Sequence, residues 1–114
     1  MARYMLLLRG GDESVGEYSP EDFQRIIQPY IDWSNTLRSE GRHLGGDELD
    51  SGGHVVRMRD GQATVDGPYT ETKESIGGYF MVQAANDEEA LEIARGCPIL
   101  KRGGFVEVRA IVEH

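Results

Sequence analysis

The stretch Asp66-Gly67-Pro68-Tyr69-Thr70-Glu71-Thr72-Lys73-Glu74 lies near the middle of this 114-residue chain, between two runs that we predict to be strands. Asp, Gly and Pro favour a turn because Asp bonds its own backbone, Gly tolerates positive φ and Pro fixes φ near about −65°. The six residues that follow hold a phenol, two hydroxyls, two carboxylates and a lysine. A plain reversal of the chain does not need this chemistry, so we expect the protein to act here.

Strand patterns lie on both sides of this stretch. Just before it, two short runs are joined by Asp60-Gly61, which is a strong signal for a two-residue hairpin turn. Just after it, a run containing Tyr79, Phe80, Met81 and Val82 is apolar on both of its faces, as is the run near the N-terminus. The runs predicted as strands cover residues 3–9, 42–49, 54–59, 62–65, 78–84 and 105–112.

Two helices are predicted between these strands. Ser19-Pro20-Glu21-Asp22 is typical of a helix start, and the apolar period continues to about Glu40, before Gly41. Pro29 interrupts this helix, and because the period survives across it we predict one kinked helix. The second helix begins at Asn86-Asp87-Glu88-Glu89, which resembles a capping box.

The order of these elements predicts the fold class. It is β-α-β-β-α-β with one extra hairpin, which is typical of a ferredoxin-like α+β domain with an antiparallel sheet over residues 1–114. Two helices cover only one face of such a sheet, yet residues 3–9 and 78–84 are apolar on both faces. We therefore predict a homodimer that packs sheet against sheet as a dimeric α/β barrel, with a cavity between the sheets.

The composition excludes several classes of partner. A net charge of −8 and a pI near 4.8 argue against nucleic acid, because phosphate binding needs a basic face. The longest apolar run, Met5-Leu6-Leu7-Leu8, is too short for a bilayer span or a signal peptide, so we expect a cytoplasmic protein. Cys97 is the single cysteine, and we expect it to be a buried, unreactive thiol. Neither the histidine spacing nor the glycine pairs match a metal or nucleotide motif, so no cofactor is expected.

The last strand supplies two candidate ligand contacts. Strand alternation places Glu107 and Arg109 on the uncovered face of the sheet. They either pair with charges on neighbouring strands or hold a ligand in the cavity. The same alternation puts Arg57 on one face of its strand, together with Val55 and Arg59. The residues expected to face the helices are Val106, Val108, Ala110 and Val112.

The central stretch supplies further candidates. Asp66 either closes the turn or acts as a carboxylate base. His54 opens a strand near the hairpin and either forms a dyad with Asp66 or is a solvated histidine. Glu71 and Lys73 either form a surface ion pair or, in the case of Lys73, attract an anionic substrate group. Tyr69 either fills the edge of the core or donates a hydrogen bond.

The stretch from Asp66 to Glu74, followed by Gly77-Gly78-Tyr79, resembles the DGPF-domain, YCII-related family. Similar residues also occur in that family at the N-terminal strand, at both helix starts and in the last strand. This resemblance implies a ferredoxin-like dimeric α/β barrel. The wider YCII group resembles muconolactone-isomerase-like barrels with a suggested His–Asp active site, which would fall on His54 and Asp66 here. This chain has Tyr69 where the family usually has Phe, and His54 where a small polar residue is common.

Two functional hypotheses follow. In the first, the protein binds a small molecule, and any reaction is a proton transfer or a lactone-type isomerisation with Asp66 as the base and no cofactor. Arg109 and Lys73 would then attract an anionic group to an otherwise acidic protein. In the second, it is a non-catalytic regulatory module that binds a protein, because DGPF-type members are often encoded beside extracytoplasmic-function sigma factors.

Overall fold

The computed structural model describes residues 1–11, 19–50, 52–66 and 76–114. Among the predicted site residues, Tyr69, Glu71 and Lys73 lie outside these ranges. The elements follow the order β1 (Ala2–Gly10), α1 (Pro20–Ser39), β2 (His43–Glu48), β3 (Val55–Arg59), β4 (Gln62–Asp66), β5 (Ile76–Ala84), α2 (Asp87–Arg95), the 3₁₀ helix η2 (Pro98–Arg102) and β6 (Gly104–Ala110).

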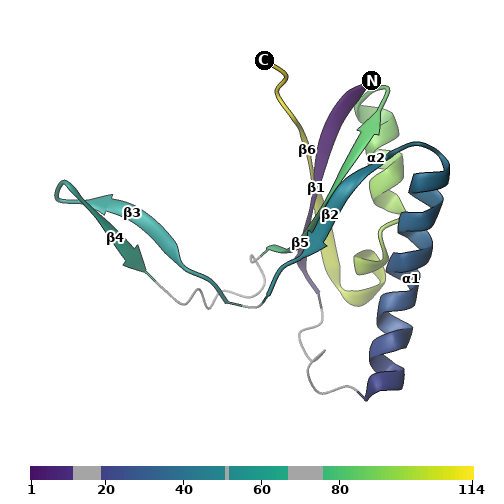
Figure 1. The fold of residues 1–114 in the computed structure, drawn as a ribbon, viewed down its shortest axis with the longest axis horizontal. Coiled ribbons are helices and arrows are strands. Elements are labelled where there is room, and N and C mark those ends of the chain that lie inside the picture. Colours follow the sequence, from purple (N-terminus) through teal and green to yellow (C-terminus); the bar gives the residue numbers. More distant parts are fainter. Residues whose placement is uncertain (12–18, 51, 67–75) are drawn as a thin grey trace.

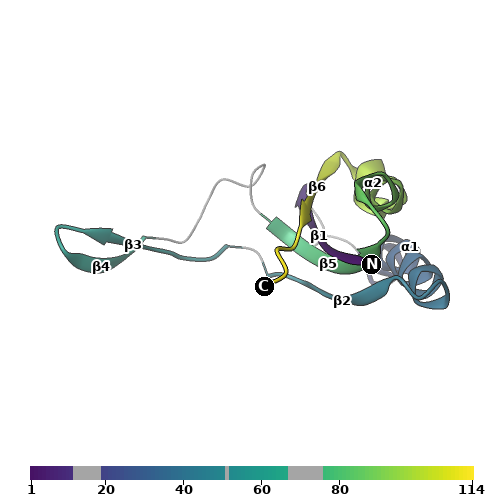
Figure 2. The same ribbon diagram turned by 90° about the horizontal axis from the view of Figure 1, so that it is seen from above.

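Four of these strands form one antiparallel sheet in the order β2-β5-β1-β6. Both α-helices lie on the same face of this sheet (Figures 1 and 2). The predicted α+β, ferredoxin-like class is therefore confirmed. We call the face away from the helices the open face.

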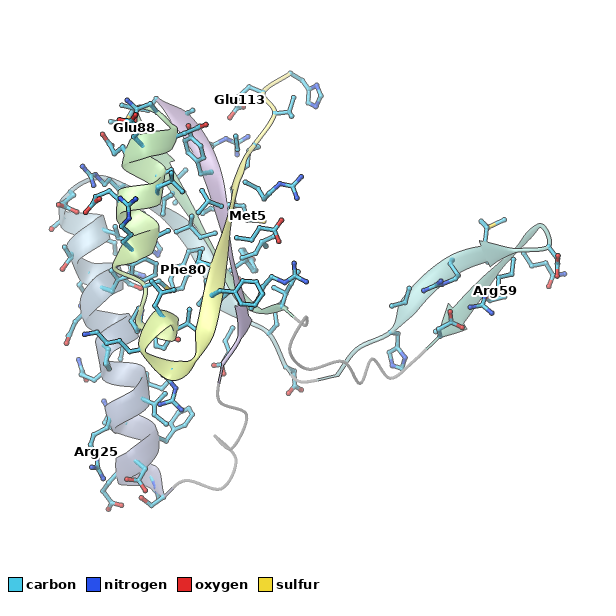
Figure 3. All side chains as sticks on the ribbon, turned by 180° about the vertical axis from the view of Figure 1, so that it is seen from behind. Met5, Arg25, Arg59, Phe80, Glu88 and Glu113 are labelled. Carbon is cyan, nitrogen blue, oxygen red and sulfur yellow. The ribbon has the colours of Figure 1, made fainter. Side chains whose placement is uncertain are left out.

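Strand alternation decides which side chains form the core. In β1, Tyr4, Leu6 and Leu8 lie under the helices and are buried, whereas Met5 and Leu7 alternate onto the open face and are half-buried. Phe80 in β5 lies on the helix side, opposite to Met5 (Figure 3). The buried hydrophobic core consists of Tyr4, Leu6, Leu8, Leu37, Val82, Ala84, Ala90, Ile93, Ala94, Cys97 and Ile99.

The first helix begins and ends where the sequence predicts. The Ser19 hydroxyl accepts a hydrogen bond from the Asp22 amide at 3.2 Å, and Gly41, with φ of 73°, follows the C-cap residue Glu40. The helix continues through Pro29 without a break, so the prediction of one helix is confirmed. Pro29 is exposed, and water can therefore satisfy the carbonyl group that its ring leaves without an amide partner.

The second helix and the turn after it complete the core. Asn86 accepts a hydrogen bond from the Glu89 amide at 2.9 Å, as the capping pattern predicts. Cys97 is only 2% exposed, and burial raises the pKa of its thiol to about 11, which confirms the buried cysteine. The short helix η2 was not predicted, because only Pro98 suggested a change of direction there. No helix in the described ranges is long and apolar enough to cross a bilayer.

The extra hairpin is a separate two-stranded sheet made of β3 and β4. Asp60 and Gly61 have φ values of 50° and 79°, the positive angles that the predicted two-residue turn requires. The hairpin extends away from the main sheet on the side opposite to the helices (Figures 1 and 2). The radius of gyration is consequently 16.1 Å, compared with about 13 Å for a compact chain of this length. We call residues 55–66 the arm.

Two adjacent glycines in β2 offer a test of how tightly the sheet is built. Gly45 and Gly46 have φ values of 152° and 156°, so alanine is strained at both positions, by roughly 1–3 kcal/mol. A Cβ on Gly46 would also lie 2.5 Å from the Tyr79 carbonyl oxygen, whereas one on Gly45 would meet nothing within 4 Å. We expect Gly46→Ala to lower the free energy of unfolding by about 1–3 kcal/mol more than Gly45→Ala in urea denaturation. Equal losses would contradict the close approach of β2 to β5.

Candidate ligand-binding site

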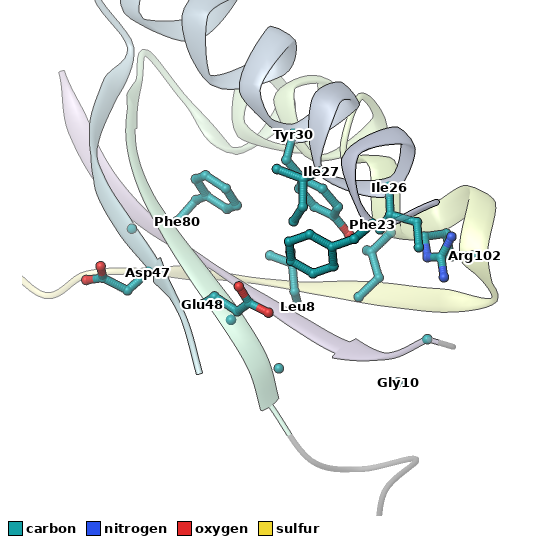
Figure 4. A pocket seen from close by; sticks show the side chains of 15 residues that line it. Leu8, Gly10, Phe23, Ile26, Ile27, Tyr30, Asp47, Glu48, Phe80 and Arg102 are labelled. Atoms are coloured by element: carbon teal, nitrogen blue, oxygen red, sulfur yellow. The ribbon is translucent and has the colours of Figure 1, made fainter. Parts of the chain in front are cut away.

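A cavity of about 300 Å³ lies between α1 and the helix-covered face of the sheet (Figure 4). This volume is at the lower end of the range for small-molecule sites, which is about 300–1,000 Å³. The cavity wall is mainly apolar, with polar groups from β2 and η2. The residues that line it are Leu8, Gly10, Gly11, Phe23, Ile26, Ile27, Tyr30, Gly46, Asp47, Glu48, Gly77, Gly78, Phe80, Ile99 and Arg102.

Glycines leave the space that this cavity occupies. In the strand register Gly46 is paired with Phe80, and Gly78 is paired with Leu8, so both glycines lie on the helix-covered face of adjacent strands. A Cβ at Gly78 would come within 3.2 Å of the Asp47 carbonyl oxygen. Because these two positions have no side chain, α1 passes over the sheet here without filling the gap. Gly46, in the strand predicted at residues 42–49, thus has a structural role in forming the cavity.

Tyr30 is the polar group that α1 contributes to the cavity. Its side chain is directed from the helix toward the sheet (Figure 4). Burial raises the pKa of the Tyr30 hydroxyl to about 12. Smaller effects come from Cys97, which raises the pKa further, from Arg102, which lowers it, and from Glu48, which raises it. The hydroxyl is therefore neutral at physiological pH. No described residue forms a hydrogen bond with it, so it is available to a ligand.

The remaining polar groups come from other elements. Glu48 is the last residue of β2, at one edge of the sheet. Arg102 is the last residue of η2, which leads into β6 at the other edge. Phe23, near the start of α1, is 42% exposed and places an aromatic ring at the cavity. The site can therefore enclose an apolar body and offer both a donor and an acceptor to a polar end. Within the described ranges, no three His, Cys, Asp or Glu side chains are grouped as metal ligands.

Glu107 and Arg109 lie on the open face, opposite to this cavity. The Glu107 carboxylate accepts hydrogen bonds from Arg9 at 2.7 Å and from Arg109 at 3.0 Å. These two bonds, that from Arg109 first, hold the pKa of Glu107 below its usual value. The predicted position of both residues is thus observed. Glu107 pairs with Arg9 on the neighbouring strand β1 and with Arg109 on its own strand β6, which is the ion-pair alternative that the sequence allowed.

Asp66 and Arg57 meet on the arm. The Asp66 Oδ2 atom lies 3.0 Å from Arg57 Nε and 3.0 Å from Arg59 Nη2, and its side chain is 40% exposed. His54 immediately precedes β3 and is exposed, but among the described residues no hydrogen bond or ion pair joins it to Asp66. Asp66 is not among the residues that line the cavity. The structure therefore brings two of the predicted site residues together, on a different sheet from Glu107 and Arg109.

No sequence motif singles out Tyr30, Glu48 or Arg102. Tyr30 fits the apolar period of α1, so the sequence pattern alone does not distinguish it from the other apolar residues of that helix. Its hydroxyl was a usable signal, because a buried tyrosine normally needs a partner for that group. Glu48 and Arg102 lie 54 residues apart, so only the folded chain brings them to one cavity.

The model of the YCII-related domain matches residues 2–114. The chain belongs to the YCII-related family. A comparison with curated proteins found no match. The match to the YCII-related domain includes both the cavity and the arm. The finer DGPF resemblance depends on Asp66 to Glu74, of which residues 67–74 lie outside the described ranges, and it stays a prediction.

The pKa of Tyr30 in this YCII-related domain predicts a specific alkaline behaviour. Between about pH 10, where an unfolded tyrosine ionises, and about pH 12, the folded protein keeps a proton that the unfolded chain has lost. The free energy of unfolding must therefore fall as pH rises through this window. We expect Tyr30→Phe to make this fall shallower in urea unfolding measured from about pH 9 to 11.

An absorbance titration of the phenols provides the control. Tyr79 is hydrogen-bonded to Asp47 at 2.9 Å, and that bond also raises its pKa, but Tyr79 does not line the cavity. The phenol that ionises near about pH 12 should be absent in Tyr30→Phe and present in Tyr79→Phe. Persistence of that phenol in Tyr30→Phe would mean that Tyr30 is not buried as described.

Proposed function

We propose that this YCII-related domain binds a small, mainly apolar molecule with one polar end in the cavity beneath α1, and that it does so as a cytoplasmic homodimer. The proposal rests mainly on the Tyr30 hydroxyl. This group is neutral, it lines an apolar cavity, and it has no hydrogen-bond partner among the described residues. Ligand sites characteristically combine an apolar wall with a few convergent polar groups, and this cavity has that composition.

The polar groups of the cavity determine which hydrogen-bonding groups the polar end of the ligand must carry. The Tyr30 hydroxyl can donate one hydrogen bond and accept others, the Glu48 carboxylate accepts, and the Arg102 guanidinium donates. They come from α1, β2 and η2, so they approach the cavity from different elements. A ligand that presents a hydroxyl, an amide or a similar donor–acceptor pair fits this set. The negative net charge of the protein favours a ligand whose apolar part provides most of the affinity.

A catalytic role for Asp66 and His54 stays a prediction. A general base must lie within hydrogen-bond reach of the proton that it removes. Asp66 belongs to the arm, where two arginines already contact its carboxylate. The carboxylate that the cavity itself offers is Glu48. A proton transfer or isomerisation within this cavity would therefore assign the base to Glu48 and not to Asp66.

The homodimer is supported by the open face. Met5, Leu7 and Met81 occupy its centre on strands β1 and β5, and both helices lie on the other face. The ion pairs of Glu107 with Arg9 and Arg109 lie beside this apolar centre, on β1 and β6. An apolar sheet face of this kind is normally covered. In a dimer with two-fold symmetry, the open face of each copy would cover the open face of the other.

The second hypothesis, a regulatory module that binds proteins, also has an observation in its favour. Val56, Met58 and Val65 on the arm are each about two-thirds exposed, and they share one face of the hairpin. Exposed apolar groups of this kind often lie at protein interfaces. Small-molecule binding and protein binding would use different parts of the chain, so the two hypotheses are compatible.

Ligand binding can be located with two matched substitutions on α1. Ile27 lines the cavity, whereas Ile31 is 42% exposed and does not. In a thermal-shift screen of a metabolite library, we expect a compound that raises the melting temperature of the wild type to act equally on Ile31→Trp. The same compound should have no effect on Ile27→Trp, because the indole ring fills the cavity.

The same screen with Asp66→Asn separates the cavity from the arm. Asp66 lies outside the cavity, so the compound should stabilise Asp66→Asn as much as it stabilises the wild type. A compound that stabilises Ile27→Trp but not Asp66→Asn would place the ligand site at the arm and would overturn the proposal. Circular dichroism of each variant checks that its fold is retained.

Dimerisation can be tested on the open face. Met81 lies at the centre of that face, and Leu91 is an exposed leucine on α2, in the opposite layer. By light scattering at micromolar concentration, we expect a dimer for the wild type and for Leu91→Glu, and a monomer for Met81→Glu, since a buried unpaired carboxylate is strongly unfavourable. A monomeric wild type would remove the homodimer from the proposal and leave the cavity beneath α1 in place.

A further inference from the structure

The arm has one apolar face and one polar face. In the strand register, Val56 is opposite Val65 and Met58 is opposite Ala63, so these four residues project from the same side of the hairpin. Val56, Met58 and Val65 are 65%, 66% and 65% exposed, respectively.

The other face of the arm is polar and satisfies its own charges. Arg57, Arg59 and Asp66 project from that side and form the ion pairs described above. Thr64 also belongs to this face and donates a hydrogen bond to the Arg57 carbonyl oxygen at 3.2 Å. The polar face therefore needs no partner, and the apolar face is the one left without a cover.

A two-stranded hairpin in water is marginally stable by itself and normally needs a surface to pack against. Among the residues that the structure describes, none provides that surface, since the arm projects from the body and its apolar side chains stay exposed (Figures 1 and 2). Both of its connections join it to strands of the main sheet, β2 on one side and β5 on the other.

The direction in which the arm projects indicates what packs against its apolar face. The helices and the arm lie on opposite sides of the sheet, so the arm extends from the end of the sheet into the space in front of the open face (Figure 2). Figure 3 shows the same relation, with Met5 on the side of the sheet from which the arm extends. Stacked sheets lie about 10 Å apart, whereas a five-residue strand such as β3 is about 16 Å long. A second copy on the open face would therefore lie alongside the arm.

The area required by a stable dimer points to the same occupant. A specific interface usually buries about 800 Å² of accessible surface on each partner. The exposed apolar side chains of the arm, Val56, Met58 and Val65, lie next to the open face and enlarge the surface that a second copy can bury. Because each copy carries a net charge of −8, a contact through an uncharged arm face also avoids bringing like charges together.

We propose that the apolar face of the arm, formed by Val56, Met58, Ala63 and Val65, packs against a second copy of this chain. The two arms of the dimer then hold the two subunits together reciprocally, as two-fold symmetry requires. This inference rests on the homodimer proposed above. It adds that the arm, and not only the open face, is part of the interface.

Two single-charge substitutions at the tip of the arm test this arrangement. Met58→Glu places a carboxylate on the apolar face, and Gln62→Glu places the same charge on the polar face, where Gln62 is paired with Arg59. By sedimentation velocity over a dilution series, we expect Met58→Glu to raise the dimer dissociation constant at least about tenfold. Gln62→Glu should change it by less than about threefold. Both positions are exposed in the single chain, so neither change disturbs its fold.

The outcomes separate the two proposals. If the wild type is a monomer at every concentration, the homodimer and the arm contact both fail. If the wild type dimerises and both variants dimerise equally well, only the arm contact fails, and the arm face is left for a protein of another kind.

A spin label on Met58→Cys provides a second measurement that does not depend on a change in affinity. The native thiol, Cys97, is buried, so labelling is selective for the new cysteine. The label should be immobile where the protein is dimeric and become mobile on dilution to the monomer. A label that is equally mobile at all concentrations would overturn the proposal.

Discussion

The packing of β1 and β5 under two helices is the constraint on which the rest of the molecule depends. Leu6 and Val82 are completely buried there, and their burial fixes which alternate residues of each strand face the helices. Only one face of the sheet is covered in this way. The side chains that alternate to the other face, Met5, Leu7 and Met81 among them, are then left half-buried by the chain's own fold. The open face is therefore a consequence of the core and not an independent feature.

The same layer arrangement produces the cavity. A helix lies at a nearly constant distance from the sheet that it covers, so a pair of positions without side chains leaves a gap beneath it. Gly46 and Gly78 are such positions, and Gly46 is held so close to the Tyr79 carbonyl oxygen that a side chain could not be added without moving β2. Packing and function are linked here, because the residues that let two strands approach closely also leave room for a ligand.

The predicted site carboxylates Glu107 and Asp66 each form ion pairs with two arginines. Glu107 lies between Arg9 and Arg109, and Asp66 lies between Arg57 and Arg59. Each carboxylate is partly exposed, so the individual ion pairs contribute modestly to stability. Their effect is to leave the apolar parts of the open face and of the arm as the surfaces without a partner. The charges of this acidic chain are thus arranged around those surfaces and not within them.

The sequence by itself determined the order of the strands and of the two α-helices, both helix caps, the Asp60-Gly61 turn and the faces of Glu107 and Arg109. It was wrong for Val112, which was expected to face the helices but lies beyond β6 and is 72% exposed. The features predicted correctly depend on residues within about four positions of each other, where hydrogen bonding and side-chain period act directly. It could not reveal that Tyr30, Glu48 and Arg102 share a cavity, or that the hairpin separates from the main sheet. The first depends on how α1 crosses glycines in two distant strands, and the second on which strand edges pair. Only the tertiary structure decides such contacts, because they join residues that no local pattern relates.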